Sequence, residues 1–514
     1  MMRLTKWILG AGVLAVMAGE AGAFSLLGPL KNAGNDPWQN TGFGGRPQGL
    51  GYSLAGDIGG PMTPLEGYRW TYPVITYAFD STFLRYFGTN GVAAVESAFQ
   101  MLNELPPASQ MSSTLTEFPL DTKAVNSTAA TLGLLDVKSI TMSLVLEEFG
   151  LANPERFVWG LRDRFTAGGN PGVTNYSVIQ MNYDPVTLQE SRYVNGVLYN
   201  YRIFDDLGPM GAEWASAVEW YQLDPLFQPY SSVAGGIGSS DAQLGSSPDD
   251  IAGLVISGLS IGEFYRGFTR DDVGGLRFLL STNNIVVESL LPDVFPSRSG
   301  GVGGSPWAPF PVLTNAPGTT NAPGGTNATG TNLSTLVRTA MRAGKDKITF
   351  QRVDYDSLLS STFRPITNRY TDTFINSTNG KIVKQKVERI IFQPDMLFAV
   401  GDLGTVTAIP VLTGRSGTTG WSNNVALNTA TGGLNLGGPG VITPGILFSF
   451  TDLVPYYFND LPADQDVTGF IGAVWGSFDG SDQPPVVYPI FQHPLLPNLS
   501  LQYLQSVALG KKKK

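Results

Sequence analysis

The chain has 514 residues, of which 42% are hydrophobic and 15% are charged, and its formal net charge is -9. This composition is too apolar for an intrinsically disordered protein, and the length favours more than one domain. The negative charge repels nucleic-acid phosphates, which argues against nucleic-acid binding.

The N-terminus has the three parts of an export signal. Arg3 and Lys6 supply positive charge, a short apolar run follows, and the small residues Ala21-Gly22-Ala23 suit a signal peptidase. A signal peptide is therefore predicted over residues 1–23, with cleavage before Phe24. No later stretch is apolar enough to cross a membrane as a helix, so no transmembrane segment is expected after cleavage. Export without cysteine is typical of bacterial envelopes and favours a periplasmic, cell-surface or extracellular location.

A first domain is predicted over residues 65–296, and an extended arm rich in Gly and Pro precedes it at residues 24–64. The β-branched and aromatic residues 74–79 predict a strand. A helix is expected next, with Asn90 as its N-cap. Its apolar face is predicted from spacings of three and four residues at Val92, Val95, Phe99 and Leu102.

Three further local signals fall within this domain. A second helix is expected over residues 134–149. Asn195-Gly196 lies between two runs of alternating aromatic and apolar residues, which predicts a β-hairpin. Thr269 is followed three positions later by Asp272, which predicts a capping box at the start of a helix.

The largest change in composition lies at residues 297–331, where Gly, Pro, Thr and Asn dominate and the sequence TNAPG recurs. Such a segment has little apolar surface to bury, so it is predicted to be a flexible linker between two domains. The second domain would then span residues 332–510. The four lysines at 511–514 are expected to form a solvated tail.

The second domain is predicted to be β-rich. Apolar spacing from Leu333 to Met341 favours one leading helix. After it, period-two patterns at residues 346–353, 370–376 and 381–392 favour strands, and Asn379-Gly380 is expected in a hairpin loop. We interpret these patterns as an antiparallel, sandwich-like domain.

Two segments of the first domain resemble the matrixin-type metzincins, which are zinc peptidases. Trp70 stands just before the strand Ile75 to Phe79, and a helix with small and aromatic apolar residues follows. Later, "FTRDDVGGLRFLL" resembles the closing helix of that family, with its Thr-x-Asp-Asp start at Thr269. The resemblance implies an α+β fold: a metzincin-like N-terminal domain followed by the sandwich-like C-terminal domain.

The zinc-binding motif of that family is absent from the sequence. Two histidines one helical turn apart hold the ion in H-E-x-x-H-x-x-G-x-x-H, and the glutamate activates water. The nearest helical candidate is "GPMGAEWASAVEWYQ", where Glu213 takes the glutamate position and Ala212 and Ser216 take the histidine positions. Neither can replace an imidazole. With one histidine and no cysteine in the chain, we expect a vestigial site, no catalytic zinc and no cofactor.

Other chemistries have weaker signals. Ser260 lies in a G-x-S-x-G pattern, but the only histidine, His493, follows the long linker, which disfavours a hydrolase triad. The paired carboxylates of a glycosidase have no sequence signature, so a glycosidase site remains an alternative. Aromatic residues also gather in two places and form either core or a binding surface: Trp220, Tyr221, Tyr456 and Tyr457.

The sequence therefore favours an exported bacterial protein with a binding or structural role and no catalysis. Its partner would be an unknown protein or polysaccharide of the cell envelope. A polysaccharide hydrolase with paired carboxylates is the first alternative. A remote metzincin peptidase with an unusual ligand set is the second.

Overall fold

The computed structural model describes residues 22–27, 61–62, 64, 69–152, 154, 158–166, 174–203, 218–222, 259, 261–297, 336–355, 363–376, 379–400, 421–423, 440–442, 445–450, 453–457, 468–472 and 474–489. Helices and strands are mixed within this part of the chain, as the sequence predicts. No helix of the described residues is long and apolar enough to cross a membrane.

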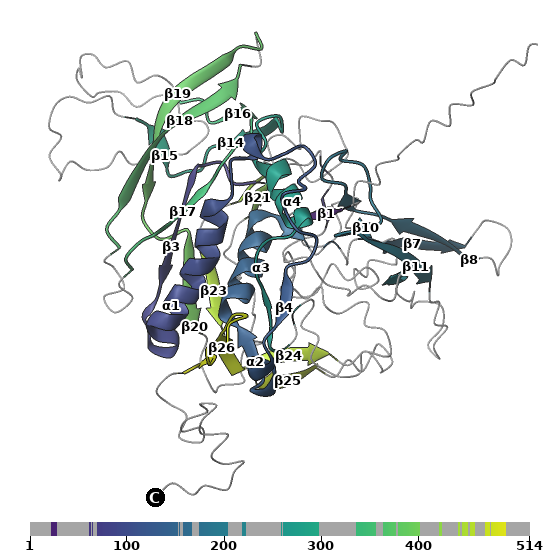
Figure 1. Ribbon diagram of the computed structural model, residues 1–514. Helices are drawn as coiled ribbons and strands as arrows, with labels where there is room; N and C mark the ends of the chain where they lie inside the picture. The colour runs from purple at the N-terminus through teal and green to yellow at the C-terminus, as the bar shows by residue number, and fades with distance from the viewer. Residues whose placement is uncertain are drawn as a thin grey trace, which may run out of the picture.

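A parallel sheet lies at the centre of the fold (Figure 1). Its order is β17 (Thr349–Arg352), β3 (Val74–Phe79), β20 (Met396–Val400) and β23 (Ile446–Phe450). All three strand pairs are parallel. The helices α1 (Ser81–Glu104) and α3 (Val137–Phe149) lie side by side against this sheet. The sheet and its helices form the main apolar core.

The first helix begins earlier than the sequence predicts. Asp80 is its N-cap, because its carboxylate accepts hydrogen bonds from the backbone N–H groups of Thr82 and Phe83 at 2.9 Å each. Asn90 is therefore not the cap. A kink at Gly88, with a φ of +59°, interrupts the helix two residues before Asn90. The predicted strand 74–79 and the helix that follows it are confirmed, but the helix begins at Ser81.

A second sheet has five antiparallel strands. Its order is β14 (Val286–Ser289), β16 (Thr339–Arg342), β18 (Ile366–Ile375), β19 (Ile382–Ile391) and β15 (Val294–Pro296). The long pair β18 and β19 is the hairpin expected around Asn379-Gly380, and Gly380 has a φ of +66° there.

The helix predicted from Leu333 to Met341 is wrong. Residues 339–342 form strand β16, residues 336–338 are not helical, and residues 333–335 lie outside the described part. Met341 and Arg342 pair with β14 on one side and with β18 on the other. Pairing on both edges, together with the burial of Arg342, outweighs a helical spacing of apolar residues.

The predicted division into domains 65–296 and 332–510 is also not what the fold has. Strand β3 is hydrogen-bonded between β17 and β20, both from beyond the predicted linker. The five-stranded sheet likewise combines strands from both sides. Since β20 and β23 join the parallel sheet, the C-terminal half is not a separate antiparallel sandwich. The composition of residues 297–331, which lie largely outside the described part, carries no information on whether the flanking segments share a core.

Several short elements surround these two sheets. Among the described residues, the remaining helical segments are α2 (Ser127–Thr131), α4 (Arg270–Leu280) and the 3-10 turn Ala108–Gln110. A small sheet on the N-terminal side contains β1 (Phe24–Leu27), β2 (Pro61–Met62), β6 (Leu151–Ala152) and β9 (Asn182–Tyr183). Only the two ends of the predicted arm 24–64, β1 and β2, are described, together with Pro64.

The other described strands form four two-stranded sheets and two three-stranded sheets. They are β10 (Tyr193–Val194) with β11 (Val197–Ile203) and β12 (Val218–Gln222); β4 (Lys123–Val125) with β13 (Glu263–Tyr265); β7 (Gly160–Thr166) with β8 (Thr174–Ile179); β21 (Trp421–Asn423) with β22 (Gly440–Ile442); and β24 (Leu453–Tyr457) with β25 (Thr468–Gly472). A last sheet joins β5 (Leu134–Asp136), β26 (Val474–Ser477) and β27 (Val486–Val487).

Three local predictions are confirmed here. Asn195 and Gly196 have φ values of +44° and +85° and connect β10 to β11 as a tight hairpin turn. Thr269 and Asp272 form the predicted capping box of α4. The helix expected over residues 134–149 exists as α3, although its first three residues belong to strand β5.

Candidate functional site

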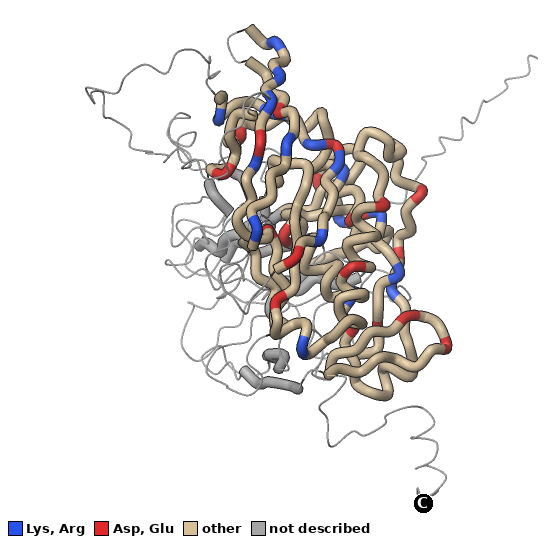
Figure 2. Tube along the Cα trace, turned by 90° about the vertical axis from the view of Figure 1, so that its left-hand side faces the viewer, with Lys and Arg blue, Asp and Glu red and all other residues tan. Residues whose placement is uncertain are grey.

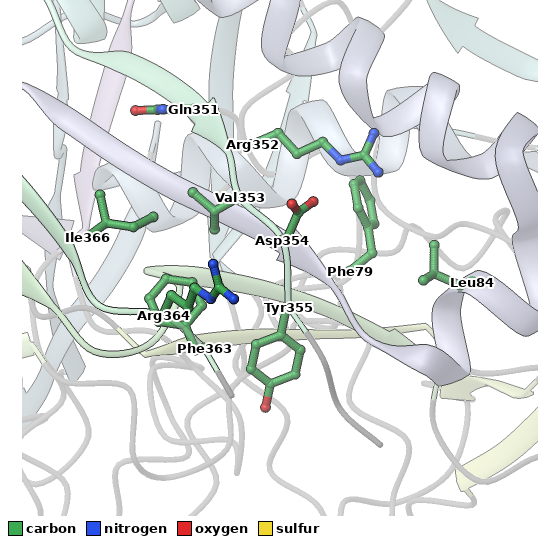
Figure 3. Close-up of a pocket in the computed structure, with 10 residues that line it drawn as sticks. All are labelled: Phe79, Leu84, Gln351, Arg352, Val353, Asp354, Tyr355, Phe363, Arg364 and Ile366. Carbon is green, nitrogen blue, oxygen red and sulfur yellow. The ribbon is translucent and has the colours of Figure 1, made fainter. Parts of the chain in front are cut away.

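A pocket of about 580 Å³ opens at the carboxyl ends of β3 and β17 (Figure 3). Ligands of open α/β sheets bind outside the carboxyl ends of the strands, and this volume is in the range of small-molecule sites. The pocket is lined by Phe79, Leu84, Gln351, Arg352, Val353, Asp354, Tyr355, Phe363, Arg364 and Ile366. It is therefore the best-placed candidate site among the described residues.

One side of the pocket is built on β3 and α1. Arg352 forms an ion pair with Glu96, with Nη1 and Oε1 2.6 Å apart, and its guanidinium carbon lies 5.4 Å from the centre of the Phe79 ring. The two charged side chains are 45% and 39% exposed, so water screens their attraction. Burial raises the pKa of neighbouring Tyr77 to about 12, so this phenol stays protonated at neutral pH.

The other side carries the groups that a ligand can reach. Arg364 and Asp354 are exposed, and the aromatic side chains of Tyr355 and Phe363 are half-buried. Figure 3 shows Arg364 and Phe363 across the strand segment from Phe79 and Leu84. Arg364 makes no ion pair with any described residue, so its guanidinium remains available as a donor of several hydrogen bonds.

The described lining of the pocket offers both stacking surfaces and hydrogen-bonding groups. It combines aromatic surface with guanidinium, amide and carboxylate groups, which can hydrogen-bond hydroxyl or acidic groups. Among the described residues that line it, Asp354 is the one carboxylate. A glycosidase needs two carboxyl groups about 5–10 Å apart across the bond that it cleaves.

A carboxylate pair does exist elsewhere, in a buried ionic cluster between the two main sheets. Arg389 on β19 binds Asp395 through Nη2 at 2.5 Å and Asp293 through Nε at 2.8 Å. Its guanidinium carbon lies 3.9 Å from the centre of the Tyr72 ring. Burial raises the pKa of Asp293, and the charge of Arg389 opposes that rise. Because Arg389 neutralises both acids, this arrangement is structural.

A second ionic cluster lies on the same inner face. Arg342 binds Asp372, with Nη2 and Oδ2 2.9 Å apart and both side chains fully buried. Arg69 binds Glu288 at 3.0 Å, and Lys345 lies 3.7 Å from Asp372. Basic and acidic residues are interspersed along the trace of the described residues (Figure 2).

Asp136, at the start of α3, is a buried acid with a local role. Its Oδ2 accepts hydrogen bonds from the backbone N–H of Ser139 at 2.9 Å and from its hydroxyl at 2.6 Å. Burial raises the pKa of Asp136 from 3.8 to about 6, against the lowering effect of these hydrogen bonds. The group caps the helix and lies outside the pocket.

We expect this acid to make stability depend on pH. Because its pKa is higher in the folded protein, the folded state binds more protons than the unfolded state between about pH 4 and 6. The free energy of unfolding should therefore fall as the pH rises through this window, by up to about 3 kcal/mol. Urea denaturation at several pH values measures it. Asp136→Asn should remove this part of the slope, while Asp482→Asn, at an exposed site, should leave it; equal slopes in both variants would contradict the expectation.

None of the residues singled out from the sequence is among the described residues that line the pocket. Ala212, Glu213 and Ser216 lie outside the described residues, so the vestigial zinc site stays a prediction. Ser260 and His493 also lie outside them. No group of three or more His, Cys, Asp or Glu within the described part is arranged to hold a metal ion.

The predicted aromatic surface falls on two separate hairpins. Trp220 and Tyr221 belong to β12, and Tyr456 and Tyr457 belong to β24. The structure describes only the backbone at these four positions, and the two strands are in different sheets. A joint binding surface therefore stays a prediction. The pocket residues Arg352, Asp354 and Arg364 were missed, because strand ends far apart in the sequence bring them together and no motif marks them.

Comparisons of this chain with protein-family models, with curated proteins and with solved structures find no match. The resemblance to the matrixin-type metzincins thus stays a hypothesis drawn from Trp70, the first strand and helix, and the start of α4.

Proposed function

We propose that this is an exported, non-catalytic binding protein of the bacterial envelope or extracellular space, and that the pocket at the carboxyl ends of β3 and β17 holds its ligand. The ligand class that fits is a polysaccharide segment. Sugar rings present apolar faces, which stack on aromatic side chains such as Tyr355 and Phe363. Their hydroxyls hydrogen-bond to groups such as Asp354 and Arg364.

The observation that carries the proposal is the described lining of the pocket, in which aromatic and guanidinium groups stand beside one carboxylate, Asp354. Two neighbouring carboxylates that are not among the described lining residues, Asp293 and Asp395, both form ion pairs with Arg389 between the sheets. Export rests on the predicted signal peptide at residues 1–23 and on the absence of cysteine. Together these features favour recognition over turnover.

Two pocket variants test the ligand site. Arg364→Ala and Tyr355→Ala should each weaken binding of soluble peptidoglycan fragments by about 10-fold or more, because each removes a charge-assisted hydrogen bond or a stacking surface. Isothermal titration calorimetry measures the dissociation constants. Arg369→Ala is the matched control, since Arg369 is an arginine on the neighbouring strand β18 whose side chain is 70% exposed. Equal affinities in all three variants would refute this site.

The same samples decide between the proposal and its alternatives. A polysaccharide hydrolase would release reducing ends from the fragments, and Asp354→Asn would abolish that release. A remote metzincin peptidase would purify with stoichiometric zinc and would lose peptide cleavage when Glu213 is changed to Gln. Binding with neither activity is the result that the proposal expects.

A further inference from the structure

The five-stranded sheet distributes its polar and apolar residues between its two faces in an inverted way. Antiparallel sheets with one face in water commonly place polar side chains on that face and apolar ones inside. Here the inner face carries buried charged residues, namely Arg342, Asp372 and Arg389. The opposite face, called the outer face below, exposes apolar side chains to water: Met341 is 38% exposed and Ile382 is 70% exposed.

Four apolar residues form one line across this outer face. Val287 is the Cα partner of Met341, Met341 of Ile375, and Ile375 of Ile382, so the line crosses β14, β16, β18 and β19 without a break. Directly opposed side chains of a sheet lie on the same face. With strands about 4.8 Å apart, this apolar line is about 14 Å long. A contiguous exposed apolar feature of this kind marks an interaction surface.

The free charges on the outer face are basic. Its positions within the five strands include four charged residues, which are Arg369, Lys384, Lys386 and Glu388. Glu388 is buried and pairs with Arg369 at 3.3 Å, so it offers no free carboxylate. Lys384 and Lys386 are exposed and form no ion pair with any described residue. Lys384 is the Cα partner of Thr373, two positions from Ile375, so the lysines lie beside the apolar line.

We propose that the outer face docks on a lipid bilayer with anionic head groups, with the apolar line entering the interface and Lys384 and Lys386 contacting the head groups. Peripheral membrane contacts combine burial of apolar area with the attraction of basic residues to anionic lipids. The net charge of the chain, -9, does not prevent this contact, because salt screens charges that lie more than about 10 Å from the head groups.

A bilayer fits this face better than the other possible occupants do. A symmetric dimer would place the basic outer face of one copy against the same basic face of the other, without a free carboxylate between them. A soluble acidic polymer would pair with the lysines but would leave the side chains of Met341 and Ile382 in water. An anionic bilayer supplies partners for both the cations and the apolar line.

The outer face is separate from the candidate pocket. Ile366 lines the pocket at the start of β18, and Ile375 ends that strand about 30 Å away. Docking on a bilayer therefore leaves the pocket open, and the membrane contact can hold or fail independently of the proposed ligand.

A fluorescent label on the outer face tests the contact directly. Because the chain has no cysteine, one introduced cysteine is a unique labelling site. A polarity-sensitive fluorophore on Thr373→Cys in the full chain should shift its emission to the blue on phosphatidylglycerol vesicles, and brominated acyl chains should quench it. Phosphatidylcholine vesicles should cause neither change. The label reports contact of this face, whatever other segment of the chain also binds the vesicles.

The matched control for the label is Thr131→Cys. Thr131 is also an exposed threonine, but it lies at the end of α2, at the opposite end of the molecule from β18 and β19 (Figure 1). Its label should not respond to either kind of vesicle. An equal response at the two sites, or no response at Thr373→Cys, would overturn the proposal.

Variants of the outer face test the two contributions separately by cosedimentation with phosphatidylglycerol vesicles. Lys384→Gln combined with Lys386→Gln should weaken binding about 10-fold or more, and Ile382→Ser about 5-fold or more. Val125→Ser is the control for the apolar contribution, since Val125 on β4 is 63% exposed, and it should bind as tightly as the unsubstituted chain.

The control for charge is Arg85→Gln combined with Arg192→Gln, which removes two exposed cations from α1 and from the residue before β10 and should leave binding unchanged. A loss in the double lysine variant but not in Ile382→Ser would identify a site for a soluble polyanion and overturn the membrane contact. A dimer of the unsubstituted chain in sedimentation equilibrium that Ile382→Ser dissociates would overturn it as well, in favour of a second copy.

Discussion

Replacing Arg389 by methionine is expected to lower the free energy of unfolding by about 3–5 kcal/mol. The guanidinium is 2% exposed, and Asp395, to which it binds, is fully buried. Removal of the cation leaves that carboxylate charged and unpaired in the interior. Asp395 also accepts hydrogen bonds from the backbone N–H of Thr76 at 2.8 Å and from its hydroxyl at 3.0 Å, so the ion pair joins β19 to β3. Urea denaturation measures the loss.

The same hairpin offers a matched control. Arg369 on β18 lies 3.3 Å from Glu388 on β19, but its side chain is 70% exposed. An exposed pair of this kind contributes about 0–1 kcal/mol, so Arg369→Met should change stability little. If Arg389→Met lowers the free energy of unfolding no more than Arg369→Met does, the ion pairs of Arg389 do not stabilise the packing of the two sheets.

The local elements of this fold could be predicted because their signals span only a few residues. The turn at Asn195-Gly196 needs two positive φ values, which Asn and Gly tolerate best. The capping box of α4 is complete within Thr269 to Asp272. The strand at residues 74–79 has the β-branched and aromatic residues that fit a pleated surface.

Predictions that depended on distant partners were wrong or incomplete. The residues around Met341 form a strand and not the expected helix, because β14 and β18 supply hydrogen-bond partners on both edges. The two-domain division failed for the same reason: a run rich in Gly and Pro shows where the chain cannot pack, but not whether its flanks pack together. The pocket depends on β3, β17 and the start of β18, and no spacing rule relates these segments.

The candidate residues show the same limit. Arg389 and Asp395 are only six positions apart, yet the cluster also needs Tyr72 and Asp293 from distant segments. The sequence showed that the histidine and cysteine ligands of a transition-metal site are scarce. Which distant side chains lie close together could be learned only from the fold.

The shared core leads to the prediction with the largest effect: neither half of the chain should fold alone. Produced separately, residues 22–297 and 336–514 should each lack a cooperative thermal transition. Strand β3 would lose hydrogen-bonded neighbours on both sides. Phe83 would lose Phe398 and Phe450, whose ring centres lie 6.1 and 5.8 Å away. Far-UV circular dichroism during heating measures this.

Mixing the two halves should restore a cooperative transition, since the parallel strands and the aromatic rings then find their partners again. The control is the intact protein cut once within residues 298–335, which should stay associated and melt cooperatively, because no described strand of either main sheet lies in that segment. A residue 336–514 chain that melts cooperatively by itself would contradict the single core. In that case the apolar contacts of Phe398 and Phe448 with each other, at 4.8 Å, would suffice without the N-terminal half.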